Sequence, residues 1–399
     1  MMKYLVMPDS FKGTMSADTV CRVIEQTLEK RDPGVRVVSA PVADGGEGTV
    51  DCILRTVPGR KAEVEVLGPD GKALGAYYGD FGDYAVIEMA SAAGFLSEDQ
   101  PRDPSRMTTF GVGSMIRDAI ETGHRHIYLG LGGSCTNDGG AGMAAALGAR
   151  FLDEEDEEFL PVGRSLNRIR RIDVSSLKQR IQGVKFTVMS DVTNPLYGPR
   201  GAAQVFGPQK GADPDMVKLL DENLADYAAV LQRELGVDVR DLPGGGAAGG
   251  MGAGCRAFLD AELKNGIDVI LDLMKFDELA ADADLVITGE GKLDSQSLEG
   301  KVISGILKRA GRLGIPVAAV CGIIDGNMEV FDRAGLSYAV QVMPSIGYGS
   351  HYRRPDGTPD YEKALEAAVS GQAGAFRELC RLGGRRRQMR KEKEKENDR

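Results

Sequence analysis

One pattern recurs along the chain and restricts its fold: a short apolar segment, a loop rich in glycine and polar residues, and a segment with helical spacing. Residues 4–8, 35–40, 126–131 and 284–288 each begin such a unit. Short apolar runs that alternate with helical patterns are typical of βαβ units, in which helices cover a parallel sheet. The pattern therefore predicts an α/β fold whose ligands lie beside the loops at the carboxyl ends of the strands.

The middle of the chain departs from this pattern. Residues 61–90 alternate apolar and polar side chains around Pro-Asp-Gly and Gly-Asp turns, which is typical of antiparallel hairpins. The βαβ spacing returns from Ile267, and 399 residues are too many for one ordinary core. We therefore expect two domains, with the second inserted into the first.

The first expected domain is a discontinuous, doubly wound (Rossmann-like) domain with a parallel sheet, over residues 1–60 and 265–382. The second is an inserted mixed α/β domain over residues 61–264, with membership of the first domain left open for residues 108–150. Residues 383–399 are mostly charged and almost free of core-forming side chains, so we predict a disordered charged tail there.

Composition disfavours several classes of partner. The formal net charge is −10, which argues against a nucleic-acid ligand because phosphates need a basic face. No apolar stretch approaches ~18 residues and no apolar leader is present, so we expect no membrane partner and a cytoplasmic location. The six cysteines form no CxxC pair, which indicates small core residues in a reducing compartment.

The most informative loop lies within residues 185–211. A short strand ends at Met189, and Asp191 follows it, at the sheet edge where ligands bind. Arg200 and Lys210 come next, among several glycines. The loop therefore offers a carboxylate, two cations and backbone N–H groups, which suits an anionic substrate and a metal ion that accompanies it. A plain surface turn is the alternative.

Two common nucleotide-binding motifs are not supported. Lys301 follows Gly300, but the first glycine and the hydroxyl residue of a P-loop are missing. Gly244, Gly246 and Gly249 formally match GxGxxG, yet the match has little weight in so glycine-rich a segment, and no strand precedes it. With three histidines in the chain, we expect carboxylates to carry any acid–base chemistry.

Several loops, taken together and in order, resemble those of the type I glycerate kinase family. They are PDSFKG (8–13), ADGGEGT (43–49), GGSCTNDGGAGM (132–143), SDVTNPLYGPRGA (190–202), GPQKGA (207–212), GGGAAGGMGAG (244–254) and ITGEGKLDSQS (287–297). The resemblance covers nearly the whole chain and leaves only the charged tail outside. It implies phosphorylation of (R)-glycerate by ATP to 2-phosphoglycerate, with Mg²⁺, in a cleft between two α/β domains.

The resemblance, combined with the chemistry of the loops, suggests catalytic and substrate-binding residues. Phosphoryl transfer depends on positioning and charge neutralisation more than on covalent chemistry. We expect Asp191 to be the catalytic base or a metal ligand, with an Asx-turn residue as the alternative. We expect Lys12 to hold a carboxylate or a phosphate, with an exposed loop lysine as the alternative. The expected substrate-binding residues are Ser10, Lys12, Asn194, Arg200 and Lys210.

Nucleotide and metal sites are expected in other loops. The expected nucleotide-binding residues are Gly244, Gly245, Gly246, Gly249, Gly250, Gly289, Gly291 and Lys292, with a flexible hinge as the alternative for the first five. The expected metal ligands are Asp44, Glu47, Glu290 and Asp294. Mg²⁺ usually takes one or two protein carboxylates. Acids that favour a helix start electrostatically are the alternative reading of Asp44 and Glu47, and the same ambiguity applies to Glu290, Lys292 and Asp294.

Two functions of other classes remain open at this point. An NAD-dependent oxidoreductase of a small hydroxy acid needs a GxGxxG motif between a strand and a helix, which this chain lacks. A two-domain organic-acid binding protein would share the cleft but needs an export signal. The sequence leaves the oligomeric state open, with a homodimer as one alternative.

Overall fold

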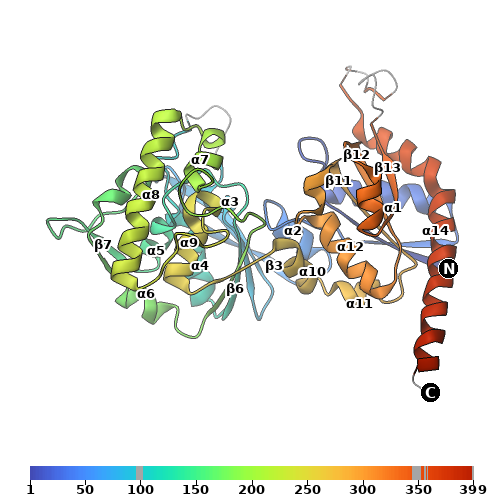
Figure 1. Ribbon diagram of the computed structural model, residues 1–399, viewed down its shortest axis with the longest axis horizontal. Coiled ribbons are helices and arrows are strands. Elements are labelled where there is room, and N and C mark those ends of the chain that lie inside the picture. The colour runs from blue at the N-terminus through green and yellow to red at the C-terminus, as the bar shows by residue number, and fades with distance from the viewer. Residues whose placement is uncertain (96–101, 344–351, 355, 357, 398–399) are drawn as a thin grey trace. The chain divides into compact units, whose positions relative to one another are not determined.

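The computed structural model describes residues 1–95, 102–343, 352–354, 356 and 358–397 (Figure 1). The chain forms two compact units. Unit 1 comprises Met1–Asp44, Asp51–Val57 and Ile267–Arg399, and unit 2 comprises Gly45–Val50 and Pro58–Gly266. Residues 108–150 therefore lie in unit 2. The prediction of an α/β fold with a doubly wound parallel sheet and a second mixed sheet is confirmed.

Unit 1 is built on a five-stranded sheet in which every neighbouring pair is parallel. The strands lie in the order β13 (Leu336–Gln341), β12 (Val317–Ile324), β11 (Leu285–Leu293), β1 (Met2–Pro8) and β2 (Val35–Ser39). The chain adds β2 on one side of β1 and β11 on the other, so the strand order reverses between β1 and β11. Such a reversal is the point at which doubly wound sheets bind ligands beyond the carboxyl ends of their strands.

Helices α1 (Ala17–Arg31) and α14 (Tyr361–Asn397) pack on this sheet (Figure 1). Helical spacing places Val20, Ile24 and Leu28 of α1 in one buried cluster with Phe376 of α14. Arg377 forms an ion pair with the buried Asp32, which follows α1. On the same sheet, α12 (Val302–Leu313) contacts β11 and β12. The shorter elements of this part of the chain are α2 (Thr49–Leu54), α10 (Gly266–Leu273), α11 (Phe276–Ala280), η3 (Ser295–Leu298) and α13 (Met328–Arg333).

Unit 2 contains a six-stranded mixed sheet. Its order is β10 (Glu262–Lys264), β9 (Lys185–Met189), β6 (His126–Gly130), β5 (Ala85–Glu88), β4 (Ala73–Asp80) and β3 (Arg60–Leu67). The first four strands are parallel, whereas β3 and β4 form the antiparallel hairpin that the alternating pattern predicts. A separate two-stranded sheet joins β7 (Arg150–Leu152) and β8 (Arg171–Asp173).

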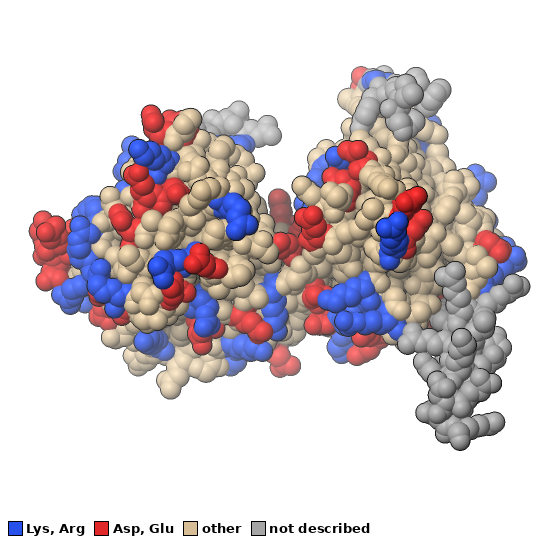
Figure 2. Space-filling model, in the orientation of Figure 1, with Lys and Arg blue, Asp and Glu red and all other residues tan. Residues whose placement is uncertain are grey.

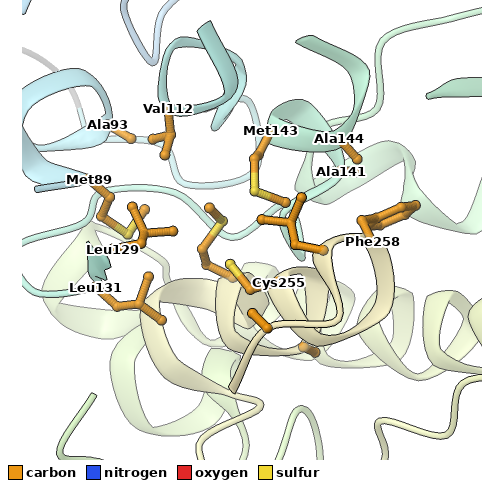
Figure 3. Packing of buried hydrophobic residues seen from close by; sticks show 14 of the residues in the cluster. Met89, Ala93, Val112, Leu129, Leu131, Ala141, Met143, Ala144, Cys255 and Phe258 are labelled. Carbon is orange, nitrogen blue, oxygen red and sulfur yellow. The ribbon is translucent and has the colours of Figure 1, made fainter. Parts of the chain in front are cut away.

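The core of unit 2 lies between this sheet and its helices. Figure 3 shows Leu129 of β6 beside Met89, in one cluster with Met143 of α5 (Ala141–Ala146), Val112 of α4 (Phe110–Glu121) and Cys255 of α9 (Ala247–Leu259). The longest helix of this unit, α8 (Pro214–Leu235), begins after the N-cap residue Asp213 and ends at a glycine. The remaining helical elements are α3 (Ala90–Ala93), η1 (Gly163–Arg168), α6 (Ser175–Arg180), α7 (Ala202–Phe206) and η2 (Pro208–Lys210).

The charged C-terminal segment differs from the prediction of a disordered tail. Helix α14 continues through it and ends at Asn397. Lys, Arg, Glu, Gln and Met all have high helix propensity, and no proline interrupts the segment. Local propensity therefore extends the helix beyond the part that packs on unit 1.

Among the described residues, no helix is long and apolar enough to cross a membrane. Figure 2 shows acidic and basic side chains interspersed over the visible face of each unit.

Candidate active site

Unit 1 contains a cavity of about 420 Å³ at the carboxyl edge of its sheet. The ends of β1, β11 and β12 and the loops that follow them surround it, so it lies at the reversal of strand order. Its charged lining residues are Asp9, Lys12, Asp44, Glu290, Lys292, Asp294 and Lys301. The predicted residues Ser10 and Gly291 also line the cavity. One site within unit 1 therefore collects seven of the residues predicted from sequence: Ser10, Lys12, Asp44, Glu290, Gly291, Lys292 and Asp294.

The loop after β1 presents Lys12. The backbone N–H of Phe11 donates to the carbonyl oxygen of Met15 at 2.8 Å, and both side chains are buried, which fixes the loop. Lys12 stands outside this turn with a side chain that is 75% exposed, and its Nζ lies 3.6 Å from Asp44 Oδ2. The nearby Asp44 carboxylate raises the pKa of Lys12. Lys12 is therefore a charged, accessible group that can hold an anion.

Strand β11 extends further than the sequence predicts. Residues 289–294 read as a loop, yet Glu290 and Lys292 pair with Cys321 and Ile323 of β12. The pairing places Glu290 on the strand, where its side chain is 8% exposed. Its Oε1 atom has no hydrogen-bond partner among the described residues. A buried carboxylate oxygen without a donor is costly, which points to a ligand of the cavity.

Glu290 and Asp9 titrate near neutral pH. Burial raises the pKa of Glu290 to about 7, while Ser297 and Lys301 oppose the shift. Burial raises the pKa of Asp9 to about 6, and the Asp44 carboxylate adds to this effect. Burial therefore makes both carboxyl groups of the cavity harder to ionise than ordinary surface acids. Side chains with such pKa values concentrate at functional sites.

Lys292 and Asp294 belong to an ion-pair group at the exposed side of the cavity. Lys292 Nζ lies 2.7 Å from Asp325 Oδ2 and 3.5 Å from Asp294 Oδ2. Asp294 also accepts a hydrogen bond from the Gln296 backbone N–H at 3.0 Å and so caps η3. Gly289, in contrast, is buried in the sheet and is not part of the cavity lining.

The structure places Asp191, Asn194 and Arg200 in unit 2 and Lys12 in unit 1. Asp191 follows β9, and its Oδ1 atom accepts a hydrogen bond from the Gly266 backbone N–H at 2.8 Å. Asn194 donates to the Arg200 carbonyl oxygen at 2.8 Å and closes the loop between them, while Arg200 is exposed. The strand-end position predicted for Asp191 agrees with the structure.

Lys210, which we expected to bind the substrate, is buried in the structure. Lys210 is 2% exposed, and its Nζ donates to Ser134 Oγ at 2.9 Å and to the Thr136 carbonyl oxygen at 2.7 Å. Burial lowers its pKa to about 8. Lys210 therefore holds the loop after β6. Asp138 holds the same loop, because its buried carboxylate accepts hydrogen bonds from the Thr109 N–H and hydroxyl and from two glycine N–H groups.

The five glycines predicted to bind nucleotide in residues 244–250 are buried in unit 2. A Cβ atom at Gly246 would lie 2.2 Å from the Pro195 carbonyl oxygen. At Gly249, where φ is +71°, it would lie 2.1 Å from the Thr136 carbonyl oxygen. Close backbone packing therefore accounts for glycine at Gly244, Gly245, Gly246, Gly249 and Gly250 without a phosphate ligand.

Glu47 is exposed, belongs to unit 2 and is not among the residues that line the unit 1 cavity. Its loop is held by Glu88, a buried residue at the end of β5. The Glu88 carboxylate accepts hydrogen bonds from the Gly48 N–H at 3.0 Å and the Val50 N–H at 2.6 Å. Among the described residues, no group of three or more His, Cys, Asp or Glu side chains could hold a metal ion.

Sequence reasoning missed three residues that the structure brings into view. Asp9 lies in the same loop as Lys12, so its position directly after a strand was an available signal. Glu88 is a lone acid within an apolar run, which marks a buried, hydrogen-bonded carboxylate. Lys301 has no P-loop around it, and only the cavity reveals its position.

The fold and the cavity define an α/β protein with a ligand site at the switch point of a doubly wound sheet. Residues 4–352 match the model of the glycerate kinase family. A glycerate 2-kinase from Escherichia coli K12 is 44% identical over 87% of this chain and 92% of its own length. A glycerate kinase from Bacillus subtilis 168 is 43% identical over 86% of this chain and 91% of its own.

A solved structure agrees with these relatives. A crystal structure of a protein assigned as glycerate kinase 2, from Salmonella typhimurium LT2, superposes with a TM-score of 0.82 at 41% identity. It covers 96% of this chain, and this chain covers 99% of it. The chain therefore belongs to the glycerate kinase family, as the resemblance of its loops indicated, and is a kinase. The oxidoreductase and binding-protein alternatives are set aside.

Proposed function

We propose that this kinase transfers the γ-phosphoryl group of ATP to (R)-glycerate and releases 2-phosphoglycerate. The observation that supports this most is the unit 1 cavity, which combines an accessible lysine with carboxylates that titrate near neutral pH. The names of the relatives supply the substrate: a glycerate 2-kinase and a glycerate kinase align over most of this chain. The free, buried cysteines suit the reducing cytoplasm, where we place the reaction.

Lys12 is the proposed anion-binding residue of the reaction. Its ammonium group is exposed and held near Asp44, so it can hold the phosphoryl group that moves or the carboxylate of the acceptor. Phosphoryl transfer brings the negative charges of ATP and of the acceptor carboxylate close together, and either contact with Lys12 would neutralise part of that charge. Neutralisation and in-line positioning are what such a reaction needs most from a protein.

The cavity also fits a Mg²⁺ ion that arrives with the nucleotide. Glu290 has a buried oxygen without a partner among the described residues, and Asp9 lies close enough to affect its pKa. Mg²⁺ commonly takes one or two protein carboxylates and completes its shell with phosphate oxygens and water. Glu290 and Asp9 would hold the ion, which would neutralise the triphosphate. The cavity then needs no third protein ligand.

Asp191 is the proposed acceptor of the proton from the attacking hydroxyl. It stands at the carboxyl end of a parallel strand, and its hydrogen bond from Gly266 fixes its orientation. Carboxylates in this role hold and orient the hydroxyl for in-line attack. This assignment concerns unit 2 alone and stands apart from the assignment of the cavity in unit 1.

The reaction is tested with ATP, Mg²⁺ and (R)-glycerate, coupled to enolase with phosphoglycerate mutase left out. Signal without the mutase shows that the C2 hydroxyl is phosphorylated, as we expect. Signal that appears only after the mutase is added shows attack by the C3 hydroxyl and overturns the regiochemistry. No signal in either case overturns the proposed function. A parallel reaction with (S)-glycerate controls for stereochemistry.

A further inference from the structure

The unit 1 cavity changes in character along the sheet edge. Its lining follows the strand order, from Met343 and Tyr361 beside β13, through Gly322 of β12 and Glu290 of β11, to Lys12 beyond β1. Three strand spacings, or about 14 Å, separate β13 from β1. The β13 end is apolar, whereas the β11 and β1 end is charged. A cavity of this form suits an elongated ligand that has one flat apolar end and one anionic end.

At the charged end of the cavity, the N-terminus of helix α12 can bind an anion together with Lys301. Three helices follow β1, β11 and β12, all within the described residues. The first turn of α1 is capped by Ser16 and carries Asp18, and that of α13 is capped by Asn327 and carries Glu329. Helix α12 has neither a side-chain cap nor an acid in its first turn, and Lys301 precedes it. Its free N–H groups and Lys301 can therefore bind an anion.

An independent observation shows that this part of the cavity is built for a ligand. Glu290 lines the same cavity, is 8% exposed and has an oxygen without a partner among the described residues. A bare phosphate beside this carboxylate would be repelled. A phosphate that carries a divalent cation satisfies both groups, because the cation binds Glu290 while Lys301 and α12 bind phosphate oxygens.

The apolar end has the side chains that bind a purine ring. Tyr361 is the first residue of α14, and Met343 follows β13. The Met343 N–H donates to the Gly322 carbonyl oxygen at 2.9 Å, which holds this segment along β12. Met15 and Phe11 add buried apolar surface from the loop after β1. Aromatic rings and methionine sulfur both pack favourably on flat conjugated rings.

We propose that the nucleotide of this kinase lies along the cavity with its base on Met343 and Tyr361 and its phosphates at Lys301 and the N-terminus of α12. The orientation rests on the proposed use of ATP. It directs the terminal phosphate toward Lys12, at the end of the cavity farthest from the base. Lys301 and Tyr361 are thus nucleotide-binding residues, even though the chain has no P-loop.

The test compares two probes, ADP and inorganic tripolyphosphate, by isothermal titration with Mg²⁺ and without glycerate. Lys301→Ala should weaken both probes about tenfold, because both contain the phosphates that a charged donor binds. Tyr361→Leu, which keeps an apolar side chain in the core, should weaken ADP about tenfold and leave tripolyphosphate unchanged. Lys308→Ala is the matched control, since Lys308 lies on the exposed side of α12 and pairs with Asp268 at 2.9 Å.

Melting temperatures of all variants are measured first, so that a variant with disturbed folding is replaced by Lys301→Gln or Met343→Ala. The orientation is overturned if Lys301→Ala binds both probes like the control, or if Tyr361→Leu weakens tripolyphosphate as much as ADP. It is also overturned if the wild-type protein binds no ADP. ADP binding with the expected variant pattern but no phosphorylation of glycerate would instead refute the proposed acceptor and leave the orientation intact.

Discussion

Glu290→Gln should make the protein more stable at alkaline pH while it damages the kinase. Burial raises the pKa of Glu290 from its ordinary 4.5 to about 7. Each pKa unit corresponds to about 1.4 kcal/mol, so keeping Glu290 ionised in the folded state costs roughly 3 kcal/mol at pH 8. Glutamine has nearly the same shape and no charge, so it removes this cost.

The pH dependence has a definite sign. Because the folded pKa of Glu290 lies above the unfolded value, the folded state binds the proton more tightly. Its contribution to stability is fully present below about pH 4.5 and is lost as the pH rises through about 7. Wild type and Glu290→Gln should therefore have similar free energies of unfolding at pH 4.5 and differ by roughly 3 kcal/mol at pH 8.

Urea unfolding followed by circular dichroism at pH 4.5, 6 and 8 measures this difference, with the exposed Glu299→Gln as the control. MgATP should then stabilise the wild type more than Glu290→Gln, because the lost carboxylate is the proposed metal ligand. Equal stabilities of Glu290→Gln and wild type at pH 8 would refute the argument from burial. A gain in stability with unchanged kinetics for MgATP would refute only the role in metal binding.

Four further changes follow from the same structure. Asp191→Asn should fold normally and lose roughly 10²–10⁴ in kcat, the usual worth of a positioned proton acceptor. Lys12→Ala should raise KM for glycerate or ATP about fivefold, since the exposed lysine contributes about 1 kcal/mol to binding. Stopping the chain after Gly384 should leave kcat and Tm unchanged, because it keeps every residue of α14 that is described as buried, the last of which is Gly383, and removes a mostly charged segment. Arg377→Ala should reduce the free energy of unfolding by about 2–3 kcal/mol, because it leaves the buried Asp32 carboxylate without its cation. The loss is smaller than for a fully buried pair because Arg377 is half-exposed.

Matched controls separate these effects from general disturbance. Asp241→Asn and Lys72→Ala change exposed residues of unit 2, and Arg381→Ala changes an exposed residue of α14. If Asp191→Asn turns over at a near-wild-type rate at saturating Mg²⁺, Asp191 is a turn residue and not the proton acceptor. Unchanged KM values for both substrates would remove Lys12 from the site. A lower Tm after truncation would show that the C-terminal segment contributes to stability. If Arg377→Ala is as stable as Arg381→Ala, the ion pair between Arg377 and Asp32 does not contribute to the free energy of unfolding.

Local sequence pattern was sufficient to predict the class of fold. Short apolar runs before glycine-rich loops predict parallel strands, and the alternation in residues 61–90 predicts the β3–β4 hairpin, because both signals come from side-chain spacing within one segment. The same spacing placed Asp191 and Lys12 in the loops that follow strands. For these strands and this hairpin, a signal from neighbours in the chain was enough, whereas the local composition of the C-terminal segment predicted disorder where α14 continues.

The pairing of β11 with β12 decided the length of β11, which the sequence alone did not predict. Glu290 was read as a loop residue because glycines surround it, but β12 continues beside it and draws residues 289–293 into the sheet. Helix α12 begins only at Val302, after Gly300, whose φ of +80° ends the preceding turn η3 and redirects the chain. That change of direction puts Lys301 at the start of α12, where it lines the cavity.

By itself, the sequence determined the class of fold, the β3–β4 hairpin and the polar loops at strand ends. Only the tertiary structure decided which polar residues line the unit 1 cavity. Lys210 and the glycines of residues 244–250 have the composition of a phosphate site, yet packing buries them inside unit 2. Asp9, Glu290 and Lys301 come from distant segments and share one cavity because β1 and β11 are neighbours in the sheet. Burial and proximity depend on the packing of the whole unit, and no single segment carries that information.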